Sequence, residues 1–117
     1  MTMPNYAFIA PILPGKTEEF KAFAKQLQGE RKAEYAASRK RSGITREVLF
    51  HQETPMGEFV VVVWETSGDP AAAMQKTFES KDPFDQWFMK RIGEIHGVTS
   101  EQTTDGDMNE LIFDWKS

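Results

Sequence analysis

Four polar residues follow one another at helical spacing in the first half of the chain: Arg31, Glu34, Tyr35 and Ser38. They continue an apolar stripe at about 100° per residue, so we expect them on the face that a helix turns toward the core. An arginine there can bind a carboxylate through two parallel hydrogen bonds. A tyrosine, or a histidine such as His96, can transfer a proton near neutral pH.

Two tryptophans are candidates for the part of the site that would hold the ligand's ring. Trp64 and Trp87 offer flat surfaces on which a planar ligand can stack, and each also carries one hydrogen-bond donor. We therefore predict catalytic roles for Tyr35 and His96. The predicted substrate-binding residues are Arg31, Glu34, Ser38, Trp64 and Trp87.

A purely structural explanation of the same residues is slightly favoured. In that case Arg31 pairs with an acid such as Glu94, and Tyr35 covers the edge of the core. His96 then lies at the end of a helix, where the helix dipole stabilises a positive charge. Both explanations remain open on the sequence alone.

Several kinds of chemistry lack their signatures. There is no cysteine, which excludes thiolate zinc sites and cysteine nucleophiles. Phosphate-binding glycine loops, paired-histidine helices and serine elbows are also missing. The two histidines and the scattered carboxylates predict no metal site, and His51 fits a surface or interface histidine. Haem binding would need an axial ligand, for which His96 and His51 are the only imidazoles. We predict no cofactor.

Charge and hydropathy limit the possible partners. The 117 residues carry a formal charge of −4, with the positive charges concentrated in residues 1–46. Acidic residues are interspersed with these positive charges on one predicted helix, so we expect a solvated helix face and no nucleic-acid partner. No apolar run approaches the ~20 residues of a membrane helix, and the first residues do not resemble a signal peptide. We expect no membrane partner and a cytoplasmic protein.

The strand that must position these residues is the clearest element. Residues 59–65 contain four consecutive valines between Phe59 and Trp64. Side chains alternate along a strand, so Val61 and Val63 face one way while Val60, Val62 and Trp64 face the other. Neither set is polar, which predicts a central strand covered on both faces.

The other elements follow from turn and cap signals. Asp69 with Pro70, and Asp82 with Pro83, are typical helix starts, whereas Gly43 and Gly97 are typical helix ends. Gly29 is expected to loosen or kink the long first helix. The predicted strands are 6–13, 44–53, 59–65 and 110–115, with a turn at 54–57 and a polar loop at 98–109. The predicted helices are 18–42, 71–79 and 84–96.

The resulting order is strand, helix, strand, strand, helix, strand, which is the ferredoxin-like α+β arrangement. We expect a single domain over residues 1–117, with a four-stranded antiparallel sheet whose central strands are 6–13 and 59–65. Both helical regions should cover one face of this sheet. Because strand 59–65 is apolar on both sides, the second face needs a cover. The simplest cover is the same face of another copy, giving a homodimer that packs sheet to sheet.

Several stretches resemble a family of small bacterial proteins of uncharacterised function within the dimeric α/β barrel superfamily. The matching stretches are Leu13-Pro14-Gly15-Lys16, Glu30-Arg31-Lys32-Ala33-Glu34-Tyr35, Ser42-Gly43-Ile44-Thr45-Arg46-Glu47, Asp82-Pro83-Phe84-Asp85-Gln86-Trp87-Phe88, Glu94-Ile95-His96-Gly97-Val98 and Phe113-Asp114-Trp115. The resemblance implies two ferredoxin-like subunits packed sheet to sheet, with a ligand cavity between helices and sheet in each. The superfamily includes cofactor-free monooxygenases, haem-degrading enzymes, small-ring isomerases and stress proteins, and fold alone does not choose among them.

Two functions follow as hypotheses. The first is a homodimeric protein that binds or converts a small planar anionic molecule in that cavity, in the manner of a monooxygenase or isomerase. The second is a non-catalytic dimeric binding or stress-response module. A cavity that joins Tyr35, His96 and Arg31 would favour the first, and a filled interior with Arg31 in a salt bridge would favour the second.

Overall fold

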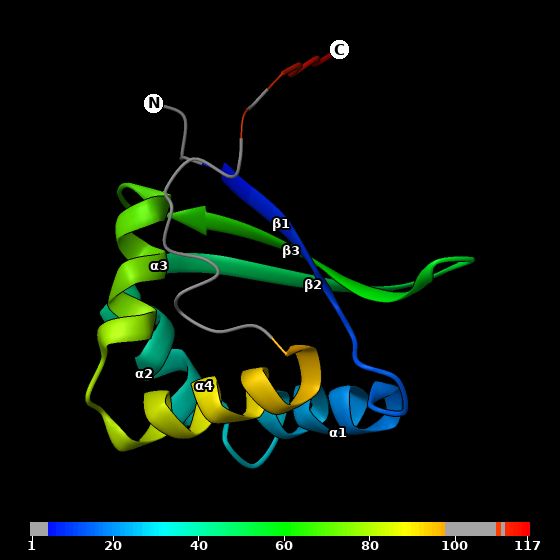
Figure 1. Ribbon diagram of the computed structural model, residues 1–117. Helices are drawn as coiled ribbons and strands as arrows, with labels where there is room; N and C mark the ends of the chain where they lie inside the picture. The colour runs from blue at the N-terminus through cyan, green and yellow to red at the C-terminus, as the bar shows by residue number, and fades with distance from the viewer. Residues whose placement is uncertain (1–4, 98–109, 111) are drawn as a thin grey trace.

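The computed structural model describes residues 5–97, 110 and 112–117. Three strands and four helices follow one another in an α+β order (Figure 1). Their bounds are β1 Asn5–Pro11, α1 Thr17–Gln28, α2 Lys32–Ser42, β2 Ile44–Thr54, β3 Gly57–Thr66, α3 Pro70–Glu79 and α4 Pro83–His96. No helix among the described residues is long and apolar enough to cross a bilayer.

The valine-rich strand β3 is the centre of the sheet. The strand order is β1-β3-β2 and both pairings are antiparallel. Val60, Val62 and Trp64 are buried, whereas Val61 and Val63 remain half-exposed on the opposite face. The predicted alternation of β3 is therefore confirmed, because a pleated strand sends successive side chains to opposite faces.

All four helices lie on one face of the sheet (Figure 1). Helices α1 and α4 run side by side beneath the strands, and α3 stands at one end of them. The apolar stripes of α1 and α4 form the core with the inner face of β1 and β3. Its most buried aromatic side chains are Phe20, Phe23, Trp64, Phe84 and Phe88.

The single helix predicted for residues 18–42 is wrong, because two helices occupy this region. Gly29 follows α1 with φ −115° and ψ −104°, and Arg31 precedes α2 in a non-helical conformation. Glycine allows this backbone geometry at little steric cost, which ends α1 completely where the sequence predicted only a kink. Thr17 is the first residue of α1, and Lys16 is its N-cap.

The predicted starts and ends of the other helices are confirmed. The carboxylates of Asp69 and Asp82 accept hydrogen bonds from the backbone N–H groups of Ala71 and Phe84, at 3.2 and 2.9 Å. A proline follows each cap at the first helical position, where its missing N–H has no partner to lose. Gly43 ends α2 with φ 80°, in the left-handed region that favours glycine.

The strand predicted for residues 110–115 is wrong over the part of this segment that the structure describes. Residues 110 and 112–117 lie in no strand, and Ile112, Phe113 and Trp115 are 80, 79 and 71% exposed. The segment points away from the sheet (Figure 1). A strand needs a neighbouring strand for its hydrogen bonds as well as a suitable sequence pattern. Because no described strand pairs with the outer side of β1, β1 is an edge of the described sheet and not one of a central pair. The polar loop expected at 98–109 lies outside the described residues.

Candidate functional site

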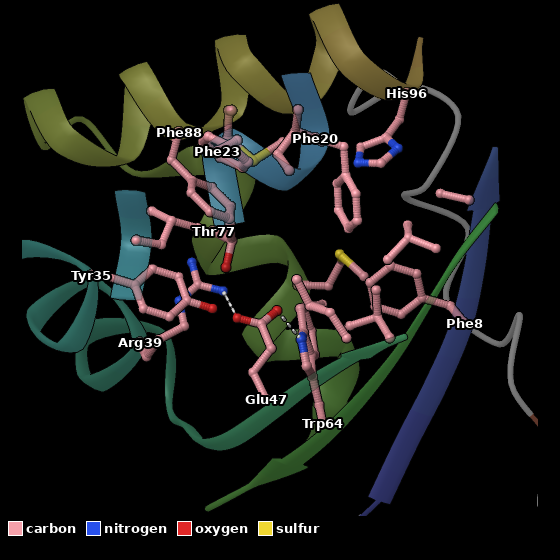
Figure 2. Close-up of a pocket in the computed structure, with 18 of the residues that line it drawn as sticks. Phe8, Phe20, Phe23, Tyr35, Arg39, Glu47, Trp64, Thr77, Phe88 and His96 are labelled. Carbon is pink, nitrogen blue, oxygen red and sulfur yellow. Dashed lines mark hydrogen bonds and ion pairs between the residues drawn. The ribbon is translucent and has the colours of Figure 1, made fainter. Parts of the chain in front are cut away.

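A cavity of about 140 Å³ lies between the inner face of the sheet and the helices (Figure 2). Its walls are almost entirely apolar. They include Phe8, Phe20, Phe23, Leu27, Tyr35, Leu49, Val60, Val62, Trp64, Met74, Phe78, Phe88, Met89 and Ile92. The polar lining residues are Arg39, Glu47, Thr77 and His96. An apolar cavity of similar size holds one benzene ring, so this space suits a single aromatic ring.

A carboxylate, an indole and a guanidinium meet at one wall of this cavity. Glu47 of β2 lies directly across from Trp64 of β3 in the sheet register. The Trp64 Nε1–H donates to one Glu47 carboxylate oxygen at 2.6 Å, and Arg39 lies 3.4 Å from the other oxygen. Figure 2 shows the three side chains converging from β2, β3 and α2.

The surroundings change the acidity of this group. Burial raises the pKa of the Glu47 carboxyl to about 7, against the hydrogen bond from Trp64, which lowers it. Removal of a carboxylate from water disfavours its charged form, so the acid and its conjugate base coexist near neutral pH. A group poised in this way suits general acid–base catalysis.

Arg39 is held in place by two aromatic rings. Its guanidinium carbon is 5.1 Å from the centre of the Tyr35 ring and 4.9 Å from that of Phe88. Burial lowers the pKa of Arg39 to about 10, which leaves it protonated at neutral pH. Its Nε–H has no hydrogen-bond partner among the described residues. The cavity wall therefore carries a fixed positive charge and one N–H group that can still donate a hydrogen bond.

Three of the seven predicted site residues line the cavity: Tyr35, Trp64 and His96. His96 enters from the last turn of α4, and Tyr35 from the first turns of α2. Burial lowers the pKa of His96, against a hydrogen bond to the Pro11 carbonyl, so the buried imidazole is neutral. The structure thus brings side chains from two helices and the central strand to one cavity.

Arg31, Glu34 and Trp87 lie away from the cavity. The Arg31 guanidinium binds both carboxylate oxygens of Glu34, at 2.8 and 3.1 Å. It also stacks on Trp87, with 3.9 Å between the guanidinium carbon and the ring centre. The predicted partner Glu94 instead pairs with Arg91, at 2.8 Å. Because the chain breaks after α1, α2 does not continue the apolar stripe that begins at Phe20. Extending that stripe at 100° per residue therefore placed Arg31 on the wrong face.

Ser38 is fully buried but faces a neighbouring polar network and does not line the cavity. Its hydroxyl accepts a hydrogen bond from Arg39 at 3.2 Å. Beside it, Arg41 binds both oxygens of buried Asp85, at 2.9 and 3.1 Å. Burial would raise the pKa of Asp85, but hydrogen bonds from Arg41, Ser38 and Ser80 hold it below the ordinary value. This network joins α2 to the start of α4.

The second histidine, His51, lies on the β2–β3 hairpin and does not line the cavity. It contacts a Glu58 carboxylate oxygen at 2.8 Å, and ligand-type atoms of His51, Glu53 and Glu58 come within 4.8 Å of one another. At about 140 Å³, the cavity itself is too small for a porphyrin.

Sequence reasoning missed Arg39 and Glu47, although signals for both were present. Arg39 is four residues after Tyr35, so the two share a helix face. The turn at 54–57 fixes a hairpin register that places Glu47 opposite Trp64. Extending the helical stripe by one step and counting back from the turn would have found both residues.

The topology and the inner cavity define a ferredoxin-like α+β protein. No protein-family model matches the chain, and no curated protein matches it. A solved structure with a similar fold is tetracenomycin F2 cyclase from Streptomyces glaucescens, described as a type-II polyketide cyclase. The two share 18% identity and a TM-score of 0.56, over 97% of this chain and 98% of that one. At this identity the likeness shows the fold.

Proposed function

We propose that this protein binds a small planar molecule in the inner cavity and exchanges a proton with it at Glu47. The observation that supports the proposal is the buried Arg39–Glu47–Trp64 group at the wall of an otherwise apolar space. Aromatic side chains favour a flat ligand, and Arg39 favours an oxygen that carries or develops negative charge. The small-molecule chemistry named for the cyclase of similar fold is consistent with this assignment.

The reaction class that fits is an isomerase-like or cyclase-like proton transfer next to a carbonyl group. The Glu47 carboxylate removes a proton from the carbon, and the electron pair moves onto the carbonyl oxygen to form an enolate. Arg39 stabilises that oxygen, because a fixed charge in a dry site acts strongly where charge develops. If the ketone is β,γ-unsaturated, the enolate is conjugated, and Glu47 returns the proton to the γ-carbon to complete an isomerisation. If the enolate carbon instead attacks a second carbonyl, the alkoxide that forms takes the proton back from Glu47 and the ring is closed.

Deuterium exchange into an enolisable aromatic ketone tests the proposal directly. We expect wild-type protein to accelerate exchange at the α-carbon of 2-indanone in D₂O, followed by proton NMR. Glu47→Gln should reduce this acceleration by 10²-fold or more, the usual contribution of a general base. Glu34→Gln is the matched control, because it changes an exposed carboxylate that lies away from the cavity. Equal exchange rates in the wild type and in Glu47→Gln would contradict the proposal.

A binding protein without turnover is the second candidate. It is favoured by the low exposure of the two charged side chains, 9% for Arg39 and 10% for Glu47. Calorimetry with the same ketone distinguishes the two. Binding to the wild type without exchange above the buffer rate would select the binding protein.

We also propose that two copies pack through the outer faces of their sheets. Ile9, Val61 and Phe50 form one row across β1, β3 and β2, and Ile9 and Phe50 are 59 and 57% exposed. Val48 and Val63 form a half-exposed pair beside that row. An apolar face of this extent on a sheet is typical of an interaction surface. A two-fold axis would cover it with itself, as the sequence predicted.

A further inference from the structure

His96 occupies one end of the cavity in a fixed orientation. It is the last residue of α4, and Gly97 follows it with φ 72°, which turns the chain immediately after the ring. The imidazole is 4% exposed and lies edge-on to Phe20, with 5.7 Å between ring centres. Figure 2 shows the ring at the cavity boundary beside Phe20, with one of its nitrogens on the cavity side.

The hydrogen bond of His96 determines which ring nitrogen carries the proton. His96 Nδ1 lies 2.8 Å from the Pro11 carbonyl oxygen, and a carbonyl oxygen can only accept. Nδ1 therefore carries the N–H. Because the buried ring is neutral, Nε2 has a free lone pair and is an acceptor. No described residue donates a hydrogen bond to Nε2.

The cavity therefore presents two different polar ends. At one end, Arg39 and Glu47 suit an oxygen that gains negative charge. At the other, His96 offers an acceptor and no donor. In Figure 2, the apolar ring of Phe20 lies between His96 and the Arg39–Glu47 end. A ligand that satisfies both ends carries a donor on the part of its ring system that meets His96.

We propose that His96 Nε2 accepts a hydrogen bond from a hydroxyl group on the ligand, which makes the ligand a hydroxylated aromatic compound. This inference rests on the proposed function, since it describes the same cavity. His96 then acts as a positioning residue, which sets which end of the ligand faces Glu47. A buried acceptor left without a donor disfavours the same ring lacking its hydroxyl, and such sites discriminate strongly between the two.

Two probes that differ by one hydroxyl group test the inference: toluene and p-cresol. We expect both to bind the wild type in calorimetry. His96→Phe replaces the imidazole by an apolar ring. In this variant the dissociation constant of p-cresol should rise at least tenfold relative to that of toluene. Comparing ratios cancels the unequal cost of taking the two probes out of water. His51→Phe is the matched control, because it removes the histidine that lies outside the cavity.

The outcomes separate the two proposals. An unchanged ratio in a variant that binds both probes would overturn the role of His96 while leaving the cavity as a binding site. Binding of neither probe by the wild type would overturn the cavity as a binding site, and the role of His96 with it.

A second measurement covers the case in which His96→Phe does not fold. In wild-type protein labelled with ¹⁵N-histidine, p-cresol should shift the Nε2 resonance of His96, because that lone pair gains a hydrogen bond. Toluene should leave the resonance close to its free position, and His51→Phe identifies the His96 signals. Equal shifts with both probes would overturn the proposed hydrogen bond.

Discussion

Glu47 and Arg39 are charged residues that the fold holds almost out of water. Each has a partner, yet the pair is not ideal: their closest contact is 3.4 Å, and the Arg39 Nε–H is unpaired among the described residues. A hydrogen-bonded ion pair built only for stability would satisfy all its polar atoms. The unpaired Arg39 Nε–H and the pKa of Glu47 near 7 are more typical of a ligand-binding or catalytic site.

The raised pKa of Glu47 predicts how stability depends on pH. The folded-state value of about 7 lies above the ordinary value of 4.5, so the folded protein binds more protons between these limits. The stabilisation that comes from protonated Glu47 is complete below pH 4.5 and is lost as pH rises through 7. Relative to Glu47→Gln, the wild type should therefore lose up to roughly 3 kcal/mol of unfolding free energy across this range. Urea denaturation of both proteins at several pH values measures the difference.

Taking the difference removes contributions that both proteins share, such as that of His96. Glu34→Gln is the control, since the pKa of Glu34 is lowered by its hydrogen bond with Arg31 and its effect falls at lower pH. Parallel pH profiles for wild type and Glu47→Gln between pH 4.5 and 7 would show that the buried carboxyl does not titrate there.

The sequence identified a cavity residue only where the assumed helix or strand period placed its side chain on the correct face. Trp64 is in the cavity because strand alternation is strict. Tyr35 was extrapolated across Gly29 in the same way as Arg31, and it reaches the cavity from the new direction of α2. Arg31 was misplaced because its position was extrapolated across Gly29. No periodic pattern survives a backbone break, so that error could not be corrected from spacing alone.

The division between α1 and α2 is the element that most affects the site. One continuous helix would place residues 31–38 along the axis of α1. The turn at Gly29 and Arg31 instead lets α2 start in a new direction, with Tyr35 and Arg39 directed at the cavity (Figure 2). The sequence indicated a weak point at Gly29 through its low helix propensity, but the new direction depends on tertiary packing.

The junction between α2 and β2 depends on the backbone freedom of Gly43. Its φ of 80° disfavours any side chain, and an added Cβ would lie 3.2 Å from the Ser67 hydroxyl. We expect Gly43→Ala to lower the unfolding free energy by about 1–2 kcal/mol, the usual penalty for alanine in this conformation. Thermal and urea denaturation give the value.

Gly68→Ala is the matched control for that junction. Gly68 lies close by, has no positive φ, and its added Cβ would meet nothing within 4 Å. It should change stability by less than about 0.5 kcal/mol. Similar losses in both variants would mean that the left-handed conformation of Gly43 is not the source of the effect.

For the whole molecule, the outer sheet face predicts a concentration-dependent dimer. We expect the wild type to sediment as a dimer at micromolar concentration, and Phe50→Lys to sediment as a monomer, because it places a charge in the apolar row. Met56→Lys is the control, since Met56 is 87% exposed at the hairpin turn and lies outside that row. A wild type that remains monomeric in sedimentation velocity would contradict the predicted dimer.

The overall architecture was largely predictable because its signals are local. Four valines and a tryptophan define β3, and Asp–Pro pairs define the starts of α3 and α4. The residues at 110–115 show the limit of this reasoning. Their short run of apolar and aromatic side chains is typical of a strand, but a strand also needs a neighbour, and a pattern within one segment cannot supply it.

The position of Trp64 has an optical consequence. Its indole donates to a carboxyl group that changes protonation near neutrality, and its ring lines the space that a ligand would fill. Trp87 and Trp115, which lie elsewhere, can be replaced by phenylalanine, leaving Trp64 as the sole indole. The fluorescence of that protein would then report both the ionisation of Glu47 and the arrival of a guest molecule, without any added dye.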